Sequence, residues 1–200
     1  MKTEKTLVII KPDGIQRSLI GEIIKRYERV GLKLIGVKMM IPTEEQATKH
    51  YYDVGGDEWI EEVGRKASAA YEKKGEKSPY KTYSENGWAI LKANAKYLSA
   101  GPVIAMIWQG ANAIELVRKI TGATAPLLAD VGTIRGDFTL DSYALADTDQ
   151  RSIRNLIHAS GEVDEAKKEI KIWFKENEIL SYTHIQDKIL YDINLDGIKE

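Results

Sequence analysis

The order of the short apolar runs restricts the fold of this chain more than any other feature of its sequence. Three runs rich in apolar and β-branched residues occur at Thr6 to Ile10, Leu32 to Ile41 and Pro102 to Trp108. Runs of this length and composition are typical of buried strands. Helical patterns separate the runs, so the sequence predicts a sheet whose strands alternate with helices.

Three helices are predicted from the spacing of apolar residues and from the residues at their ends. The first of them follows the turn residues Pro12-Asp13-Gly14, which end the first strand. The predicted helices are one from Leu19 to Gly31, one that opens at a capping box of Thr43 and Gln46 and carries His50 and Tyr51, and one from Ala113 to Lys119 with Asn112 as its N-cap and Gly122 as its stop.

The C-terminal third completes the predicted core. Ser160 is expected to cap a helix that starts with acidic residues, and the period-two pattern from Glu169 to Phe174 predicts a fourth strand. The core then reads βαββαβ, which is the ferredoxin-like arrangement. We therefore expect an α/β (α+β) fold in which a four-stranded antiparallel sheet carries helices on its faces.

Two segments lie outside this core. Residues 54–88 have weak periodicity and are predicted to be an insertion, part ordered and part mobile, in which Trp59, Ile60 and Val63 form one short helix. The segment from Ala123 to Ile153 is too long for an ordinary connection, and its residues 139–152 are predicted to be a lengthened loop. We expect residues 1–200 to form a single domain that includes both segments.

The composition excludes several classes of protein. The chain has no Cys, which excludes a disulfide framework, a thiolate nucleophile and a cysteine-based zinc site. Its 29 basic and 30 acidic side chains give a net charge of -1, so binding to nucleic acid is not expected. The N-terminus lacks a signal-peptide pattern, and no apolar stretch has the length of a membrane helix. We expect a cytoplasmic protein without a membrane partner.

Without a thiol, the candidate nucleophiles include the three histidines. His50 falls on a predicted helix and His184 in the polar C-terminal segment, and a histidine taken by itself is more often structural than catalytic. His158 is different because it precedes the small residues Ala159 and Gly161, where a loop is expected to meet a helix N-terminus. Glu169 could bind one of its ring nitrogens and leave the other free to react.

Basic residues favour His158 as a phosphoryl acceptor. Lys11 follows the first predicted strand, Arg118 lies near the end of a helix, and Arg135 lies between Gly132 and Gly136. Two of them have a structural explanation when taken alone: a solvated charge for Lys11 and a favourable helix C-terminal charge for Arg118. Arg135 is harder to explain in this way, because the glycines beside it indicate special backbone geometry or close approach. Together they offer an ammonium group and two guanidinium groups for phosphate oxygens. Phosphoryl transfer through His158 is the chemistry that this set favours.

The same residues, taken with their neighbours, closely resemble the nucleoside diphosphate kinase family. The resemblance runs from about Thr3 to Tyr191, interrupted by insertions, and the Asn-x-x-His-x-Ser element combined with the Thr-Ile-Arg-Gly-Asp loop is highly specific. The matching elements are Lys11-Pro12-Asp13-Gly14-Ile15-Gln16-Arg17, His50-Tyr51, Gly101-Pro102-Val103, Gly132 to Phe138, Asn155 to Ser160, Glu169-Ile170 and Trp173-Phe174.

The resemblance implies a ping-pong enzyme that moves the γ-phosphate of a nucleoside triphosphate, such as ATP, to a histidine and then to a nucleoside diphosphate. It also implies Mg²⁺, held mainly by the nucleotide phosphates, and a homo-oligomer, either hexamer or tetramer. The roles that it implies are His158 as nucleophile, Glu169 as its orienting carboxylate, Ser160 as support for Glu169, Lys11 at the ribose and terminal phosphate, Tyr51 beside the γ-phosphate, Arg118, Thr124 and Arg135 at the β- and γ-phosphates, and Asn155 at the ribose.

Departures from the family pattern concern two places. Gly161 stands where the family usually has Asp, and Ile90 and Leu91 stand in place of two Phe of the base-stacking region. Ile90 is therefore predicted to contact the base, with Trp88 or an aromatic residue of the insertion as another candidate. Two alternatives stay open: a catalytically inactive nucleotide- or nucleic-acid-binding protein on the same scaffold, and a phosphohistidine relay to protein substrates.

Overall fold

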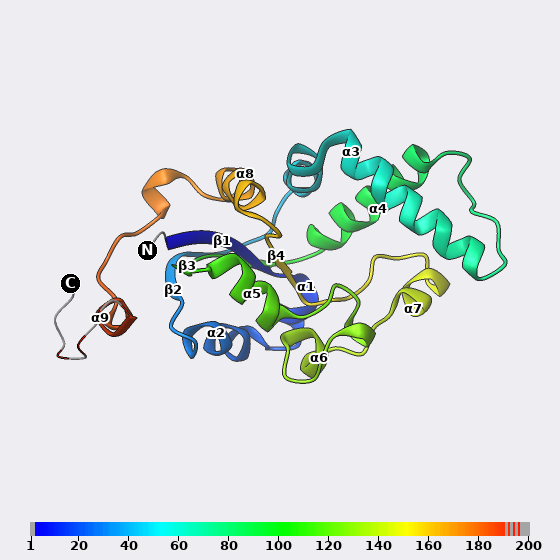
Figure 1. Ribbon diagram of the computed structural model, residues 1–200. Coiled ribbons are helices and arrows are strands. Elements are labelled where there is room, and N and C mark those ends of the chain that lie inside the picture. Colours follow the sequence, from blue (N-terminus) through cyan, green and yellow to red (C-terminus); the bar gives the residue numbers. More distant parts are fainter. Residues whose placement is uncertain (1–2, 191, 193, 195, 197–200) are drawn as a thin grey trace.

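A computed structural model describes residues 3–190, 192, 194 and 196 of the chain and contains a four-stranded sheet (Figure 1). The strand order is β2-β3-β1-β4, and each strand is antiparallel to its neighbours. This arrangement confirms the predicted ferredoxin-like sheet. The strands are β1 (Thr3–Ile10), β2 (Lys33–Met40), β3 (Val103–Ala111) and β4 (Ile157–Ala159).

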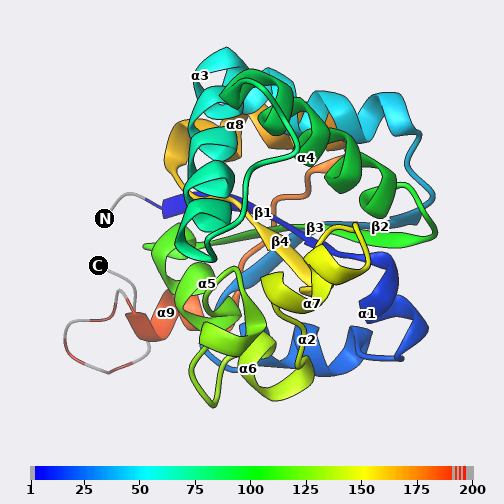
Figure 2. The ribbon, with the colours of Figure 1, turned by 90° about the vertical axis from the view of Figure 1, so that its right-hand side faces the viewer.

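Helices cover both faces of the sheet. Figures 1 and 2 show α3 and α8 on one face and α2, α5 and α6 on the other. The helices are α1 (Pro12–Gln16), α2 (Ile20–Glu28), α3 (Glu44–Lys73), α4 (Tyr83–Leu98), α5 (Ala113–Thr121), α6 (Ile134–Phe138), α7 (Tyr143–Thr148), α8 (Val163–Trp173) and α9 (Ile185–Leu190), with 3-10 turns at Pro126–Leu128 and Glu176–Glu178.

The alternation of side chains along β1 produces two cores. Val8 and Ile10 pack with α2 and α5 on one face, whereas Leu7 and Ile9 pack with α3, α4 and α8 on the other. All four side chains are fully buried. Strand β1, one of the two interior strands, therefore contacts both helical layers, and its carboxyl end leads directly into Lys11.

The predicted fourth strand was wrong. Residues 169–173 belong to α8 and Phe174 is its C-cap, whereas the fourth strand is Ile157–Ala159, which carries His158. The buried residues Ala166, Glu169, Ile170 and Trp173 recur at helical spacing, so the apparent period of two came from too short a window.

The predicted cap at Ser160 was also wrong. Glu162 is the N-cap residue of α8, without a side-chain cap. Ser160 instead follows β4, where its hydroxyl accepts a hydrogen bond from the Leu7 N–H at 3.1 Å. Ser160 thus extends the contact between β4 and β1, and its hydroxyl also contacts the carboxylate of Glu169 on α8.

The segment 54–88 forms a helical hairpin rather than one short helix. Helix α3 continues to Lys73 across a kink at Gly56, where φ is +61°, and α4 returns antiparallel to it (Figure 2). The two helices approach so closely that a Cβ at Gly64 or Gly87 would lie 1.8 Å and 2.0 Å from a main-chain oxygen of the other helix. Small residues therefore allow this close packing.

The long segment 123–153 also contains more regular structure than expected. It contains α6, α7 and a 3-10 turn. Asp141 organises its second half by accepting hydrogen bonds from Arg151 and from the main-chain N–H groups of Ser142 and Arg154. None of the described helices combines the length and the apolar character needed to cross a membrane.

Three smaller predictions also have an outcome. Thr43 caps α3 by accepting from the Gln46 N–H, but the Gln46 side chain donates to Ile172, so only half of the capping box forms. Pro12-Asp13-Gly14 begins the short helix α1 instead of a simple turn. Asn112 occupies the N-cap position of α5 with a φ of +50°, without a side-chain cap.

Candidate active site

His158 lies in the middle of β4, opposite Ile9 of β1. It does not lie at a helix N-terminus as the sequence suggested. Its neighbours Ile157 and Ala159 are buried, whereas the His158 side chain keeps 17% of its surface exposed. The main chain of His158 is held by the pairing of β4 with β1, and its imidazole is partly exposed. The ring is therefore both fixed in position and accessible to a ligand.

Glu169 reaches the His158 imidazole from α8. Its Oε1 lies 2.8 Å from Nε2 of His158, a hydrogen-bonding distance, although the ring N–H is not aligned with the oxygen. The hydroxyl of Ser160 donates to the other oxygen, Oε2, at 2.5 Å. The predicted contacts among His158, Glu169 and Ser160 are therefore present.

Burial and charge set the protonation of this pair. Burial, followed by the positive charge of Lys11, lowers the pKa of His158, so its imidazole is neutral near pH 7. Burial also raises the pKa of Glu169, which the hydrogen bond from Ser160 opposes. A neutral imidazole with its proton on the Nε2 that faces a carboxylate carries its lone pair on Nδ1, so Nδ1 is the ring atom that can act as a nucleophile.

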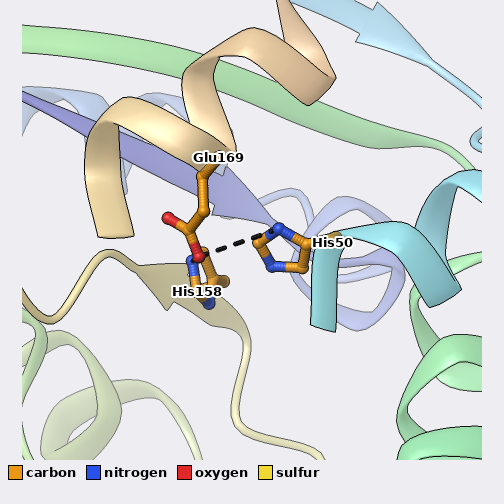
Figure 3. A group of neighbouring side chains, drawn as sticks. All are labelled: His50, His158 and Glu169. Atoms are coloured by element: carbon orange, nitrogen blue, oxygen red, sulfur yellow. Dashed lines mark ion pairs between the residues drawn. The ribbon is translucent and has the colours of Figure 1, made fainter. Parts of the chain in front are cut away.

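His50 and Trp173 join this cluster. Figure 3 shows His50 reaching from α3 toward Glu169 and His158. The two imidazole rings are 4.4 Å apart at 86°, and Nδ1 of His50 lies 3.7 Å from Oε1 of Glu169. The indole N–H of Trp173 donates to the same Nδ1 at 3.2 Å. No role could be predicted for His50 from the sequence, because its neighbours here come from distant parts of the chain.

Lys11 lies at the carboxyl end of β1 and is 7% exposed. Its ammonium group donates to Oδ1 of Asn155 at 2.8 Å, and the Asn155 amide donates to the main-chain oxygen of Thr124 at 3.0 Å. Three predicted binding residues are thus connected. Burial, followed by the charge of Arg135, lowers the pKa of Lys11 to about 7.

Tyr97 was missed by the sequence reasoning. Its ring has the Lys11 ammonium 4.8 Å from its centroid and the Arg154 guanidinium 4.4 Å from it. Its hydroxyl donates to Asp13 at 2.5 Å. Tyr97 lies 84 positions from Asp13, and no local pattern connects them.

Arg118 and Arg135 approach β4 from the other side of the site. A terminal nitrogen of Arg118 lies 3.5 Å from the Ala159 oxygen. Arg135 is buried, and its three nitrogens donate to the main-chain oxygens of Asn155, Gly122 and Ile157. Arg135 thus connects the main chain before and within β4 to Gly122. The N–H hydrogens that these three bonds do not use are left for a ligand.

The surroundings of residue 161 explain why this chain has Gly there instead of the Asp that is usual in the family. The Glu165 carboxylate accepts a hydrogen bond from the Gly161 N–H at 2.5 Å. A Cβ on residue 161 would lie 2.5 Å from the same carboxylate oxygen. Glu165 therefore occupies the space beside residue 161 and provides a negative charge that acts on His158.

Tyr51 lies at the edge of the cluster, and Ile90 does not join it. The ring of Tyr51 contacts His50 at 4.9 Å and stacks with Trp59 of the predicted insertion at 6.2 Å. Burial raises the pKa of Tyr51, so its hydroxyl stays protonated. Ile90 is half-buried on α4, and no contact described for the cluster involves it.

The donor set at His158 does not suit Mg²⁺. One ligand atom each from His50, His158 and Glu169 lies within 4.8 Å of the others. Two imidazoles and one carboxylate are a transition-metal set, whereas Mg²⁺ prefers oxygen ligands. Nδ1 of His50 already accepts the Trp173 N–H. The cluster is therefore better described as an oriented imidazole than as a magnesium site.

Comparison with known proteins gives consistent matches over most of the chain. The nucleoside diphosphate kinase family matches residues 4–70 and 60–179. The nucleoside diphosphate kinase of Pyrobaculum aerophilum is 40% identical over 184 residues, covering 90% of this chain and 100% of that protein. The enzyme of that name from Borreliella burgdorferi is 43% identical over 183 residues, covering 91% and 93%.

Solved structures agree with these matches. The crystal structure of an NDP kinase from Pyrobaculum aerophilum is similar with a TM-score of 0.86 at 39% identity, covering 90% of this chain and 100% of that one. A structure of the Borrelia burgdorferi enzyme, described as a transition-state mimic with bound vanadate and ADP, has a TM-score of 0.73 at 39% identity and covers 91% and 93%.

Proposed function

This chain belongs to the nucleoside diphosphate kinase family, and from that membership we propose that His158 is the residue that carries the phosphoryl group. The observation that supports this assignment best is the 2.8 Å contact between Nε2 of His158 and Glu169. It supports a neutral imidazole whose proton is on Nε2 and whose lone pair is on Nδ1.

The reaction then has two balanced steps. Nδ1 of His158 attacks the γ-phosphorus of a nucleoside triphosphate, and the bond from that phosphorus to the β-phosphate oxygen breaks. The nucleoside diphosphate leaves. A second diphosphate then attacks the phosphorus of the phosphohistidine through its β-phosphate oxygen, the bond from that phosphorus to Nδ1 breaks, and free His158 is restored. Glu169 stabilises the imidazolium character that develops at Nε2, and nearby cations stabilise the charge on the phosphoryl oxygens.

The binding roles follow from the positions of the polar groups. Lys11 and Asn155 are joined by a hydrogen bond, so a ligand that binds one of them meets the other. Arg118 lies beside β4, and Arg135 retains N–H hydrogens. We assign the ribose to Asn155 and both the ribose and the terminal phosphate to Lys11. We assign the β- and γ-phosphates to Arg118, Thr124 and Arg135, and the space beside the γ-phosphate to Tyr51. Ile90 stays a prediction for the base.

Magnesium is proposed to enter with the nucleotide. The cluster at His158 has too few oxygen ligands for Mg²⁺, whereas two phosphate groups supply oxygens readily. When bound there, the ion would neutralise charge on the β- and γ-phosphates. The protein groups around it would be the cations already described, not a carboxylate cage.

A homo-oligomer is supported by two exposed apolar patches. Val37, Met39 and Ile41 lie on one side of the edge strand β2 and its continuation and are 54%, 58% and 68% exposed. Leu127, Leu128 and Val131 form the second patch and are 73%, 72% and 93% exposed. Patches of this kind are common at subunit contacts.

Three further expectations remain proposals: a cytoplasmic location, a single domain over residues 1–200, and the status of residues 54–88 and 139–152 as additions to the family core. Helix α3, which runs into this segment, packs on α8 as well as on α4, which supports one domain. Its Trp59 stacks on Tyr51, so residues 54–88 lie at the edge of the proposed site.

Steady-state kinetics test the proposed function. Initial rates with ATP and a second nucleoside diphosphate, both varied in the presence of Mg²⁺, should give parallel double-reciprocal lines. Intersecting lines would contradict the phosphohistidine route. Nucleotide binding without turnover would favour the inactive binding protein, and phosphorylated enzyme that transfers to no diphosphate would favour the relay to protein substrates.

A further inference from the structure

His50 is a buried imidazole that the proposed reaction does not use. It is 1% exposed, lies on α3, and its Nδ1 is 3.7 Å from Oε1 of Glu169. The same carboxylate oxygen lies 2.8 Å from Nε2 of His158. Two imidazole nitrogens therefore face one oxygen, as Figure 3 shows.

The other oxygen of Glu169 offers no alternative. Oε2 accepts the hydroxyl of Ser160 at 2.5 Å, and Ser160 is fully buried. A proton on Nδ1 of His50 would thus make His50 a competing donor for Oε1. Competition would weaken the contact that orients His158, because hydrogen bonds to a carboxylate are directional and strong.

Trp173 removes this competition. Its indole nitrogen lies 3.2 Å from Nδ1 of His50 and can only donate. Nδ1 then accepts this hydrogen bond, which puts the single proton of a neutral His50 ring on Nε2, a buried nitrogen without a hydrogen-bond partner among the described residues. Burial, followed by the charge of His158, lowers the pKa of His50 to about 3, so the ring carries only one proton near pH 7.

We propose that Trp173 and His50 are positioning residues that keep Oε1 of Glu169 available to His158 alone. Trp173 is one helical turn after Glu169 on α8, so one helix carries both the carboxylate and the donor that sets the His50 tautomer. The inference rests on the proposed role of His158. It adds that the nucleophilic form of His158 depends on the tautomer of a second histidine.

The first test is a phosphorylation rate. In Trp173→Phe the His50 proton is free to move to Nδ1, and single-turnover phosphorylation by ATP should slow by about fivefold, the factor equivalent to a hydrogen bond of about 1 kcal/mol. The KM for nucleotide should stay unchanged. The matched control is Trp108→Phe, since Trp108 is equally buried and its indole N–H has no partner among the described residues.

The double variant Trp173→Phe/His50→Phe separates positioning from packing. It lacks the competing donor, so it should phosphorylate faster than Trp173→Phe alone. Two independent packing losses would instead make the double variant slower than either single variant, and that result would overturn the proposal.

Nitrogen-15 NMR of the histidine rings, in the wild-type protein without nucleotide, tests the tautomers directly. His50 should carry its proton on Nε2 and accept at Nδ1, and His158 should also carry its proton on Nε2. A proton on Nδ1 of His50 would overturn the inference even if the variants failed to fold. If both tautomers are as expected but ATP leaves His158 unphosphorylated, the proposed function fails while the tautomer assignment stands.

Discussion

Lys11 combines a buried ammonium group with neighbours of the same charge, so its protonation should control nucleotide binding. Its pKa is lowered to about 7 in the free protein. Phosphate oxygens stabilise the ammonium form and raise this pKa on binding, so binding takes up a proton above pH 7.

We therefore expect nucleotide affinity to fall as pH rises above about 7, by at most about tenfold per pH unit for one proton. Calorimetry in buffers of different ionisation enthalpy measures the proton uptake. In Lys11→Met the pH dependence should disappear together with most of the affinity. Wild-type binding without proton uptake at pH 8 would contradict the role of Lys11.

Ser160 affects the reaction through Glu169. Its hydroxyl lowers a carboxyl pKa that burial raises, so the substitution Ser160→Ala should raise that pKa further. Glu169 must be ionised to orient His158, and activity is lost as pH falls through its pKa. The acid limb of the kcat/KM profile should move to higher pH in Ser160→Ala. Ser142→Ala, which removes the cap of α7, should leave that limb in place.

The residues of the site differ in how far the sequence predicts them. His158 and Lys11 stand beside small or turn residues in the sequence, whereas Asn155 is indicated only by the family resemblance. The structure places Lys11 and Asn155 in contact. Tyr97 and Trp173 received no role from the sequence. Their roles depend on Asp13 and His50, which lie 84 and 123 positions away, and local periodicity carries no information about such contacts.

At the scale of elements, short windows explain the main error. Residues 169–174 alternate in polarity over too few positions to separate strand from helix, and only Ala166 extends the buried face far enough to show the helical period. Conversely, β4 has only the three residues Ile157–Ala159, and its place at the sheet edge comes from pairing with β1. A strand this short forms because it pairs with residues far away in the sequence, and local sequence patterns do not show such pairing.

The close crossing of α3 and α4 predicts a large effect of one methyl group. In Gly87→Ala the new Cβ would lie 2.0 Å from the Ile60 oxygen, which forces the helices apart. The free energy of unfolding should fall by about 1–3 kcal/mol, the usual cost of overpacking.

Urea denaturation measures this loss, and Gly21→Ala on α2 is the matched control. A Cβ at Gly21 meets nothing within 4 Å, so alanine should stabilise α2 by about 0.5–1 kcal/mol. Equal stabilities of Gly87→Ala and wild type would contradict the packing of the hairpin.

At the scale of the whole molecule, the α3–α4 hairpin and the long segment 123–153 contact each other through side chains outside the sheet. Lys74, just after α3, forms an ion pair with Asp147 of α7 at 2.8 Å. Asn94 of α4 accepts a hydrogen bond from Ser152 at 2.5 Å. The two segments that the sequence set apart from the core thus contact each other, and neither could be placed from its own composition.

The exposed apolar patches predict the behaviour of the protein in solution. Met39→Glu and Leu128→Glu each introduce a charge into one patch, and each should reduce the mass measured by light scattering on a sizing column, because burying an unpaired charge is costly. Lys92→Glu, at an exposed position on α4, should keep the wild-type mass. A monomeric wild-type protein would contradict the assembly.

The central claim is that His158 carries the phosphoryl group between nucleotides. It is tested most directly by incubating the protein with ATP labelled at the γ-phosphate, with Mg²⁺ present, and then treating it with acid or base. The account predicts a label on the wild-type protein that acid releases and base does not, that a nucleoside diphosphate removes, and that is absent from His158→Ala. A wild-type protein that stays unlabelled, or a label that persists in His158→Ala, would contradict it.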